Sequence, residues 1–317
     1  MAGCLACGSA RCYTPLAMTI QQTLSTICSV PSAPALRDAV EQAWAVRKSH
    51  HPDTILLVRP YATAPISVTG PACALDCAHC GGHYLQHMES LTAPSSRSSR
   101  SYLISGGCDS RGVVPLAAHR EAIAELARHH RLVLHVGLMP PLELASMDLP
   151  VAAVSLDIVG DRETALEVYG LDVPLATYIA QFEALSEIAP VVPHITIGLH
   201  AGQIRGEYEV IRALLPLAPE RVVFLVLIPT AGTRYASCLP PSPEQVASVL
   251  ATARCLLPDT RLYLGCMRPP GRYRQTLDVL AIAAGVNAIV NPTRAAERAV
   301  EEAGLSTTLG DECCALY

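Results

Sequence analysis

The sequence predicts an α/β fold in which parallel strands alternate with helices and form a full or partial barrel of the TIM type. Short apolar runs rich in β-branched residues recur along the chain, and helix-like segments separate most of them. The 317 residues suffice for one large barrel. Strands that alternate with helices form parallel βαβ units, and eight such units would close the barrel. The predicted strands are 66–69, 101–105, 132–136, 153–158, 194–199, 222–228, 261–266 and 288–291, and the predicted helices between them include 115–129, 175–188, 207–215, 243–256 and 272–284.

The barrel is predicted to occupy residues 65–295, between two extensions that carry cysteines. The N-terminal extension, residues 1–64, contains a predicted helix at 34–47 and a short apolar run at 55–58 that leads into the barrel. The C-terminal tail, residues 296–317, carries the adjacent Cys313 and Cys314.

Composition narrows the classes of function. The net charge of −5, with no long basic run, argues against a nucleic-acid partner. No apolar run reaches the roughly 18 residues that span a bilayer, and the N-terminus lacks the pattern of a secretory signal. Thirteen cysteines in such a chain indicate metal binding or catalysis rather than disulfides. We therefore expect a cytoplasmic protein without a membrane or nucleic-acid partner.

The strongest chemical signal is the trio Cys73, Cys77 and Cys80, spaced C-x3-C-x2-C directly after the first predicted barrel strand. Soft thiolates select iron–sulfur, zinc or Cu(I) sites. Three thiolates can bind three irons of a [4Fe–4S] cluster and leave the fourth open, as catalysis requires, whereas a ferredoxin-type carrier needs four ligands. The alternative is a structural zinc site with His79 or His83 as the fourth ligand.

A second group of thiols lies near the N-terminus, where Cys4, Cys7 and Cys12 are spaced C-x2-C-x4-C. This pattern indicates a second, auxiliary [4Fe–4S] cluster. Its fourth ligand would come from Cys28 or from the pair Cys313-Cys314. A small zinc knuckle and unliganded thiols are the alternatives, and the spacing does not separate them.

Residues that follow the strands are further candidates, because ligands of parallel α/β folds bind at the carboxyl ends of the strands. Ser105-Gly106-Gly107 closes the second predicted strand, where glycines let the backbone approach a ligand or form an ordinary turn. Asp157 ends the fourth strand and would accept hydrogen bonds from a ligand or cap the following helix.

Two more candidates follow the fifth and seventh predicted strands. His200 lies in a glycine-rich turn. It either faces a ligand or is a turn residue whose hydrogen bonds are satisfied locally. Arg268 has a fixed charge suited to carboxylate or amide recognition, the alternative being a surface ion pair.

These motifs together resemble the biotin-synthase-related branch of the radical S-adenosylmethionine (SAM) superfamily, over about residues 65–295. The resemblance rests on the cysteine motif, on Ser105-Gly106-Gly107, on Pro229-x-x-Gly232-Thr233 and on Met267-Arg268-Pro269. It implies a [4Fe–4S] cluster on Cys73, Cys77 and Cys80 whose open iron binds SAM, and cleavage of SAM to a 5′-deoxyadenosyl radical by an electron from that cluster.

The resemblance also implies roles for individual residues. Ser105-Gly106-Gly107 would hold the SAM amino group, although Cys108 stands where an acidic residue is common in the family. His79 takes the place of an aromatic residue near the adenine, His200 belongs to the adenine-binding element after the fifth strand, and Arg268 faces the active site. Asp157 would bind the ribose or the substrate.

With the terminal cysteines included, the chain resembles one subunit of the two-subunit lipoyl synthases. That resemblance implies sulfur insertion at C6 and C8 of an octanoyl chain on a carrier-protein lysine, with the auxiliary cluster as sulfur source. It also implies a second radical SAM subunit and an electron donor such as ferredoxin or flavodoxin. The N-terminal cysteine spacing is shorter than in single-chain lipoyl synthases, and Cys313-Cys314 stands instead of their Arg-Ser-Ser-Tyr terminus. A radical SAM mutase, a cofactor-maturation enzyme and a non-catalytic zinc protein are the competing interpretations.

Overall fold

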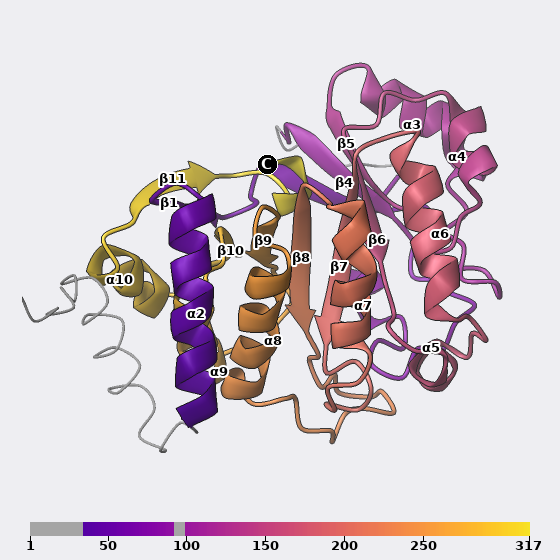
Figure 1. The fold of residues 1–317 in the computed structure, drawn as a ribbon. Coiled ribbons are helices and arrows are strands. Elements are labelled where there is room, and N and C mark those ends of the chain that lie inside the picture. The colour runs from indigo at the N-terminus through magenta and orange to yellow at the C-terminus, as the bar shows by residue number, and fades with distance from the viewer. Residues whose placement is uncertain (1–33, 92–98) are drawn as a thin grey trace, which may run out of the picture.

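The computed structural model describes residues 34–91 and 99–317, so Cys4, Cys7, Cys12 and Cys28 lie outside the described residues. The described strands are β1 (Thr54–Val58), β2 (Thr63–Ser67), β3 (Glu89–Ser90), β4 (Ser101–Ser105), β5 (Arg131–His135), β6 (Ala153–Asp157), β7 (Val191–Ile197), β8 (Arg221–Val226), β9 (Arg261–Leu264), β10 (Ala288–Val290) and β11 (Ser306–Gly310). They form one sheet in the order β11-β1-β10-β9-β8-β7-β6-β5-β4-β2-β3 (Figure 1). All neighbouring strands are parallel, and β11 and β3 are its two edges. The expected barrel is therefore an open, partial one.

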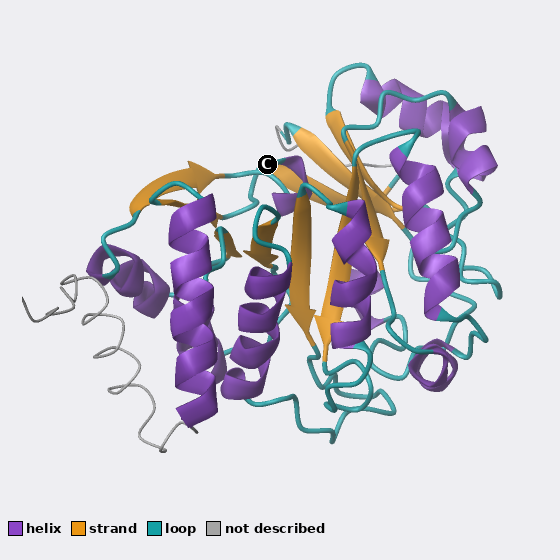
Figure 2. Cartoon of the chain, in the orientation of Figure 1, coloured by secondary structure: helices purple, strands orange, loops and turns teal. Residues whose placement is uncertain are grey.

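Helices cover one face of this curved sheet (Figure 2). The described helices are α2 (Pro34–His50), α3 (Arg120–Ala127), α4 (Pro141–Met147), α5 (Arg162–Tyr169), α6 (Leu175–Ser186), α7 (Glu207–Leu214), α8 (Pro243–Leu256), α9 (Arg272–Ala283) and α10 (Arg294–Glu302), with single 3₁₀ turns η1 (His83–His87), η2 (Ala117–His119), η3 (Leu215–Leu217) and η4 (Cys314–Leu316). Local sequence explains their starts. Ser242 and Gln245 form a capping box before α8, and Asp161 and Thr293 cap α5 and α10. In the described part of the chain, no helix is both long enough and apolar enough to cross a bilayer.

All eight strands predicted from the sequence are confirmed, with ends that differ by a few residues. The prediction for residues 66–69 is shifted, because β2 runs from Thr63 to Ser67. The apolar run at 55–58 does more than lead into the barrel, since it forms β1 between β10 and β11. The edge strands β3 and β11 were not predicted.

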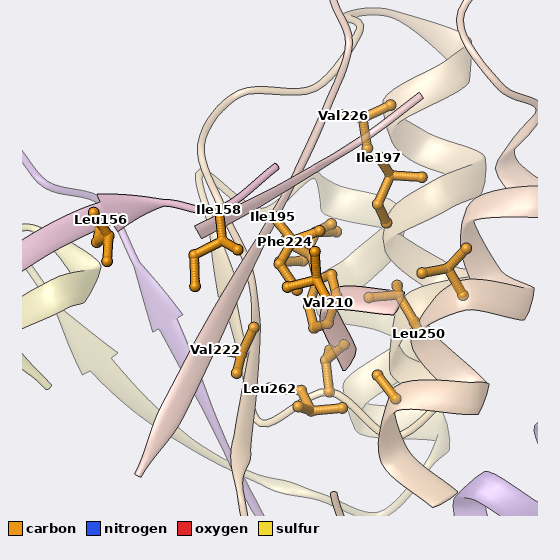
Figure 3. Packing of buried hydrophobic residues seen from close by; sticks show 14 of the residues in the cluster. Leu156, Ile158, Ile195, Ile197, Val210, Val222, Phe224, Val226, Leu250 and Leu262 are labelled. Carbon is orange, nitrogen blue, oxygen red and sulfur yellow. The ribbon is translucent and has the colours of Figure 1, made fainter. Parts of the chain in front are cut away.

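The two faces of each strand enter different cores, because side chains alternate along a strand. Val222 and Phe224 of β8 point toward the helices and pack in a cluster with Val210 and Leu250 (Figure 3). Val223 lies on the opposite face, in a smaller cluster with Val133 of β5, Val192 of β7 and Tyr263 of β9, together with Cys314, Ala315 and Leu316 of η4. The C-terminal tail therefore packs against the face that the helices leave free, inside the curve of the sheet.

Polar contacts fix the tail where several strands begin. Arg131, the first residue of β5, donates to the carbonyl oxygen of Leu316 at 3.1 Å, and Arg221, the first of β8, donates to that of Ala315 at 3.2 Å. The Tyr263 hydroxyl donates to the Tyr317 carbonyl oxygen at 3.0 Å. In Figure 1 the C-terminus lies near the ends of β7 and β8 opposite their arrowheads. The tail thus fills the interior from the side where these strands begin and leaves their carboxyl ends to other residues.

Candidate active site at the carboxyl ends of the strands

The cysteine motif lies on a loop between β2 and η1, with Cys73 exposed and Cys77 and Cys80 half-buried. Backbone hydrogen bonds fix this loop at three points: Ala74 N–H donates to Cys108 O at 2.8 Å, Ala78 N–H donates to Val168 O at 2.8 Å, and Ala78 O accepts from Tyr235 N–H at 2.9 Å. The partners follow β4, lie in α5, and follow β8. Segments far apart in the sequence therefore hold the three thiols at the carboxyl end of the sheet.

The turn after β4 is in direct contact with this loop, and Gly107 makes the contact possible. A Cβ atom on Gly107 would lie 2.6 Å from the Cα of Cys73 and closer still to the carbonyl oxygen of Ala72. The Gly107 N–H donates to Thr69 Oγ1 at 2.7 Å. Gly106 is less crowded, since its nearest neighbour would be a methyl group of Val68 at 3.0 Å. The glycines predicted to let the backbone approach a ligand also let it approach the cysteine loop.

The thiols of this region lie within electrostatic reach of one another. Burial, and then the thiols of Cys80, Cys73 and Cys108, raise the pKa of Cys77 to about 12. Burial and the neighbouring Cys73 likewise raise the pKa of Cys108 to about 12. Cys108 is thus a fourth thiol beside the motif, which the sequence showed only as a departure from the family pattern. The raised pKa values favour the protonated thiols. A bound metal would reverse this preference, because coordination deprotonates a thiol.

The grouping fits a cluster better than a single ion. Within residues 34–91 and 99–317, no three His, Cys, Asp or Glu side chains converge closely enough to hold one metal ion. A zinc site needs its sulfur ligands about 2.3 Å from the same ion. In an iron–sulfur cluster each thiolate binds a different iron, so the ligands stand further apart. The donor set of Cys73, Cys77 and Cys80 therefore suits a [4Fe–4S] cluster with one open iron.

Polar side chains line the interior next to this loop. His135, Ser155 and Asp157 share the strand face of the inner cluster, because they alternate with residues of the outer core. His135 Nε2 lies 3.3 Å from Asp157 Oδ2, and Ser155 Oγ lies 3.1 Å from Nδ1 of His194 in β7. The side chains of His135 and Asp157 are 34% and 42% exposed, so a ligand that enters the interior can reach them.

Electrostatics favour the charged forms of His135 and Asp157. Burial alone would raise the pKa of Asp157, but His135, with smaller contributions from His194 and His79, lowers it to about 2. Burial alone would lower the pKa of His135, but the Asp157 carboxylate outweighs it and raises that pKa. Asp157 is a hydrogen-bond acceptor in the interior and not a helix cap, because Asp161 caps α5.

The predicted histidines differ in their surroundings. The His79 ring stands edge-on to Tyr169, 5.8 Å between centroids, with its Nδ1 buried and unpartnered. Burial lowers the pKa of His79 to about 4, so the ring is neutral at pH 7. His200 Nδ1 lies 3.1 Å from Thr164 Oγ1. Glu207, which the sequence analysis missed, holds the preceding turn by accepting from Gly198 N–H at 2.6 Å.

The expectation that Arg268 faces the active site is wrong, and so is the surface alternative. Arg268 is fully buried and pairs with the equally buried Asp278 of α9, with Nε to Oδ1 at 2.9 Å. Its Nη1 donates to the carbonyl oxygens of Gly265 and Val290 at 2.7 and 2.8 Å. The five donors of a guanidinium suit it to this task, so Arg268 joins the ends of β9 and β10 to α9 and leaves no donor for a substrate.

The C-terminal cysteines lie in the interior, brought there by the tail. Cys313 N–H donates to Thr63 Oγ1 at the start of β2, at 2.7 Å, and Cys314 is 6% exposed. The two adjacent thiols shift each other's pKa: Cys314 lowers the pKa of Cys313, and Cys313 together with burial raises the pKa of Cys314. Whether they share a cluster with Cys4, Cys7 and Cys12 stays a prediction, because those residues lie outside the described part of the chain.

Known proteins are similar to this chain in sequence and in fold. No protein-family model matches the sequence. The chain is 27% identical to a biotin synthase from Synechococcus sp. (strain JA-3-3Ab) over 296 residues, 84% of this chain and 93% of that protein. It is 25% identical to a biotin synthase from Pseudomonas putida (strain GB-1) over 272 residues, 80% of this chain and 75% of that one.

Solved structures share the fold at lower identity. Methylornithine synthase (PylB) superposes with a TM-score of 0.63 at 14% identity, covering 93% of this chain and 97% of its own. The hydrogenase maturase HydG from Carboxydothermus hydrogenoformans superposes with a TM-score of 0.59 at 17% identity, covering 87% and 70%. At this identity the similarity concerns the fold.

Proposed function

We propose that the chain is a radical SAM enzyme related to the biotin synthases, with two of which it shares 27% and 25% identity, and that it inserts sulfur into a protein-bound octanoyl chain as one subunit of a two-subunit lipoyl synthase. The observation that carries this proposal is the presence of cysteines at both ends of one interior. Cys73, Cys77 and Cys80 lie at the carboxyl ends of the strands, and Cys313 and Cys314 reach the same interior from the other side.

The residues at the carboxyl ends would hold the cofactors. Cys73, Cys77 and Cys80 would bind the [4Fe–4S] cluster, which together with SAM supplies a radical able to remove hydrogen from an unactivated carbon. The backbone of Ser105-Gly106-Gly107 lies against the cysteine loop, where it can hold the SAM amino group. The ring of His79, within that loop, offers a neutral face, and Asp157 offers a charged acceptor for a ribose or a substrate.

The interior walls differ in polarity, which supports an acyl substrate. His135, Asp157 and His194 line one side. Leu56, Leu103 and Leu225 from β1, β4 and β8 are only partly buried where they pack against the inner apolar cluster. An octanoyl chain would lie along the apolar wall, because burying each methylene contributes about 0.8 kcal/mol.

Sulfur insertion needs a donor, which we propose is a second iron–sulfur cluster held by cysteines outside the Cys73 loop. The candidates are Cys4, Cys7 and Cys12 near the N-terminus and Cys313 and Cys314 in the interior. A second radical SAM subunit, an octanoylated carrier protein or peptide and an electron donor such as ferredoxin or flavodoxin complete the proposal, and the cytoplasm is its expected compartment.

Anaerobic reconstitution tests the proposal. The protein, alone and with a candidate partner subunit, is incubated with SAM, a reductant and an octanoyl-lysine peptide, and 5′-deoxyadenosine and peptide mass are measured. We expect 5′-deoxyadenosine, and a peptide mass gain of one or two sulfur atoms. Cys77→Ala should abolish both, and Cys255→Ala on α8, remote from the cysteine motif in sequence, serves as the matched control.

The two measurements test the radical function and the sulfur insertion separately. Absence of 5′-deoxyadenosine from iron-loaded protein would contradict a radical function altogether. Formation of 5′-deoxyadenosine without any sulfur gain, with the partner present, would contradict the lipoyl synthase assignment and favour a radical SAM mutase or maturation enzyme.

A further inference from the structure

Inward-facing side chains show where the interior of the sheet is filled and where it is open. Residues that point to one face lie two positions apart along a strand. On the inner face of β5, Val133 is fully buried, whereas the side chain of His135 is 34% exposed. On that of β8, Val223 is fully buried and Leu225 is half-buried. The open part of the interior therefore begins one layer of side chains beyond Val133 and Val223, toward the carboxyl ends of the strands.

The C-terminal tail fills the layer that is closed. Cys314, Ala315 and Leu316 of η4 are buried in one cluster with Val133 and Val223. A ligand that enters from the carboxyl ends and follows the inner face of β5 or β8 therefore meets the tail after one layer of side chains. The tail is the floor of the open space.

Hydrogen bonds hold this floor on both sides of the tail's buried segment. Before η4, the backbone N–H groups of Arg59 and Ala62, in the turn between β1 and β2, donate to the carbonyl oxygens of Gly310 and Asp311, both at 2.8 Å. Within η4, the two arginines that begin β5 and β8 hold the carbonyl oxygens of the last turn. The position of the floor is thus a property of the fold.

Apolar side chains lead from the open space to the floor. Leu103 of β4 and Leu225 of β8 are half-buried and pack against the cluster that contains the tail. Leu316 has the largest side chain of the η4 residues, and its exposed fraction of 9% is also the largest among them. Leu316 is therefore the tail residue whose side chain the end of an apolar ligand would contact.

We infer that the C-terminal tail is the floor of the substrate site and that Leu316 sets the length of the acyl chain that the protein accepts. This inference rests on the proposed function, which takes an octanoyl chain as substrate. Each methylene that enters the space above the floor is removed from water and strengthens binding. A chain longer than this space must displace packed side chains, and overpacking weakens binding. Affinity should therefore pass through a maximum as the acyl chain is lengthened.

The test measures the binding of a series of acyl-lysine peptides to the full-length protein. The protein is reconstituted anaerobically with iron, sulfide and SAM, and the reductant is omitted so that binding is measured without turnover. Hexanoyl, octanoyl, decanoyl and dodecanoyl peptides are titrated by calorimetry. For the wild type we expect affinity to rise about tenfold from the hexanoyl to the octanoyl peptide, and to fall by about tenfold or more at the decanoyl peptide.

Two substitutions of Leu316 should move this maximum in opposite directions. Leu316→Ala lowers the floor, so the maximum should move to the decanoyl peptide, which should bind about tenfold more tightly than it binds the wild type. Leu316→Phe raises the floor, so the maximum should move to the hexanoyl peptide. Leu309→Ala is the matched control, because Leu309 belongs to the same tail but is 76% exposed on β11, and it should keep the octanoyl maximum.

A melting curve by circular dichroism establishes that each variant folds. The opposite shifts distinguish a floor from a general loosening of the tail, because loosening would lower the affinity for all the peptides alike.

Two results would overturn the inference. One is an unchanged octanoyl maximum in whichever of Leu316→Ala and Leu316→Phe folds. The other is a wild-type affinity that keeps rising through the dodecanoyl peptide, since no floor would then limit the chain. A wild type that binds none of the peptides would refute the acyl substrate and the inference together. A maximum that moves with Leu316, in a protein that adds no sulfur to the octanoyl peptide during turnover, would refute sulfur insertion and leave the floor standing.

Discussion

Replacing Gly107 by alanine should displace the cysteine loop and abolish the radical chemistry while leaving the fold intact. The added methyl group would lie 2.6 Å from Cys73 Cα and 2.7 Å from Cys73 Cβ, well inside van der Waals contact. Backbone atoms cannot rotate away as a flexible side chain can, so the loop must shift. Overpacking of this kind costs roughly 1–3 kcal/mol. Hydrogen bonds of Ala74 and Ala78 hold the cysteine loop against Cys108 and Val168, so a shift at Cys73 would distort the segment that carries the three cysteines.

The assay for Gly107→Ala measures iron content, SAM cleavage and the free energy of unfolding of the iron-free protein. We expect the iron bound by Cys73, Cys77 and Cys80 and the formation of 5′-deoxyadenosine to fall at least tenfold, with a stability loss of about 1–3 kcal/mol. Gly106→Ala adds the same methyl group in the same turn, but against the movable side chain of Val68 at 3.0 Å, so it should lower iron binding less than Gly107→Ala does. If Gly107→Ala bound iron and cleaved SAM like the wild type, the close approach of turn and loop would not matter for function.

Three further predictions concern single side chains. Arg268→Leu leaves the buried Asp278 carboxylate without its guanidinium partner and should cost about 3–5 kcal/mol of unfolding free energy, measured by denaturant titration. The folded fraction should still cleave SAM. Loss of cleavage at unchanged stability would contradict this structural role. Asp157→Asn removes the charge that raises the pKa of His135 and leaves the burial that lowers it. The pKa of His135 should therefore fall below its ordinary 6.5, as measured by an NMR titration of the histidines. An unchanged value would refute the pairing. His79→Phe keeps a ring edge-on to Tyr169 and removes the unpartnered Nδ1. The melting temperature should therefore stay the same or rise, and SAM cleavage should persist. Loss of SAM cleavage would show that the nitrogen has a function.

The sequence was most informative where structure depends on local pattern. Short apolar runs rich in β-branched residues and helices with polar caps are properties of a few adjacent residues, and strands β2 and β4 to β10 and helix α8 were found this way. The cysteine motif was also local, and its place after a strand put it at the carboxyl end of the sheet.

What the sequence did not predict depends on contacts between distant segments. β11 reads Ser-Thr-Thr-Leu-Gly and is mostly exposed, so it lacks the apolar signal of a core strand and exists because β1 offers it a free edge. Arg268 looked like a ligand-binding residue because its partner Asp278 lies on the following helix.

The placement of the C-terminal tail depends on Tyr317, so it can be tested by a variant that leaves every cysteine unchanged. The Tyr317 hydroxyl accepts from the backbone N–H groups of Asp311 and Glu312 at 2.8 and 3.0 Å. Its ring packs on Gly310, where a Cβ atom would lie 2.8 Å from the ring. Tyr317→Phe therefore removes the acceptor and keeps the packing, and it should cost about 1–3 kcal/mol.

If Cys313 is a ligand of the proposed second cluster, Tyr317→Phe should also lower the iron of that cluster, while the iron held by Cys73, Cys77 and Cys80 and SAM cleavage stay unchanged. Tyr317→Ala should be more severe, since it loses the ring as well. Equal iron at both sites in the two variants and in the wild type would mean that the second cluster does not depend on where the tail is held. The hydrogen bonds to Asp311 and Glu312 fix the residues directly before Cys313, so a site that includes Cys313 must respond when they are removed.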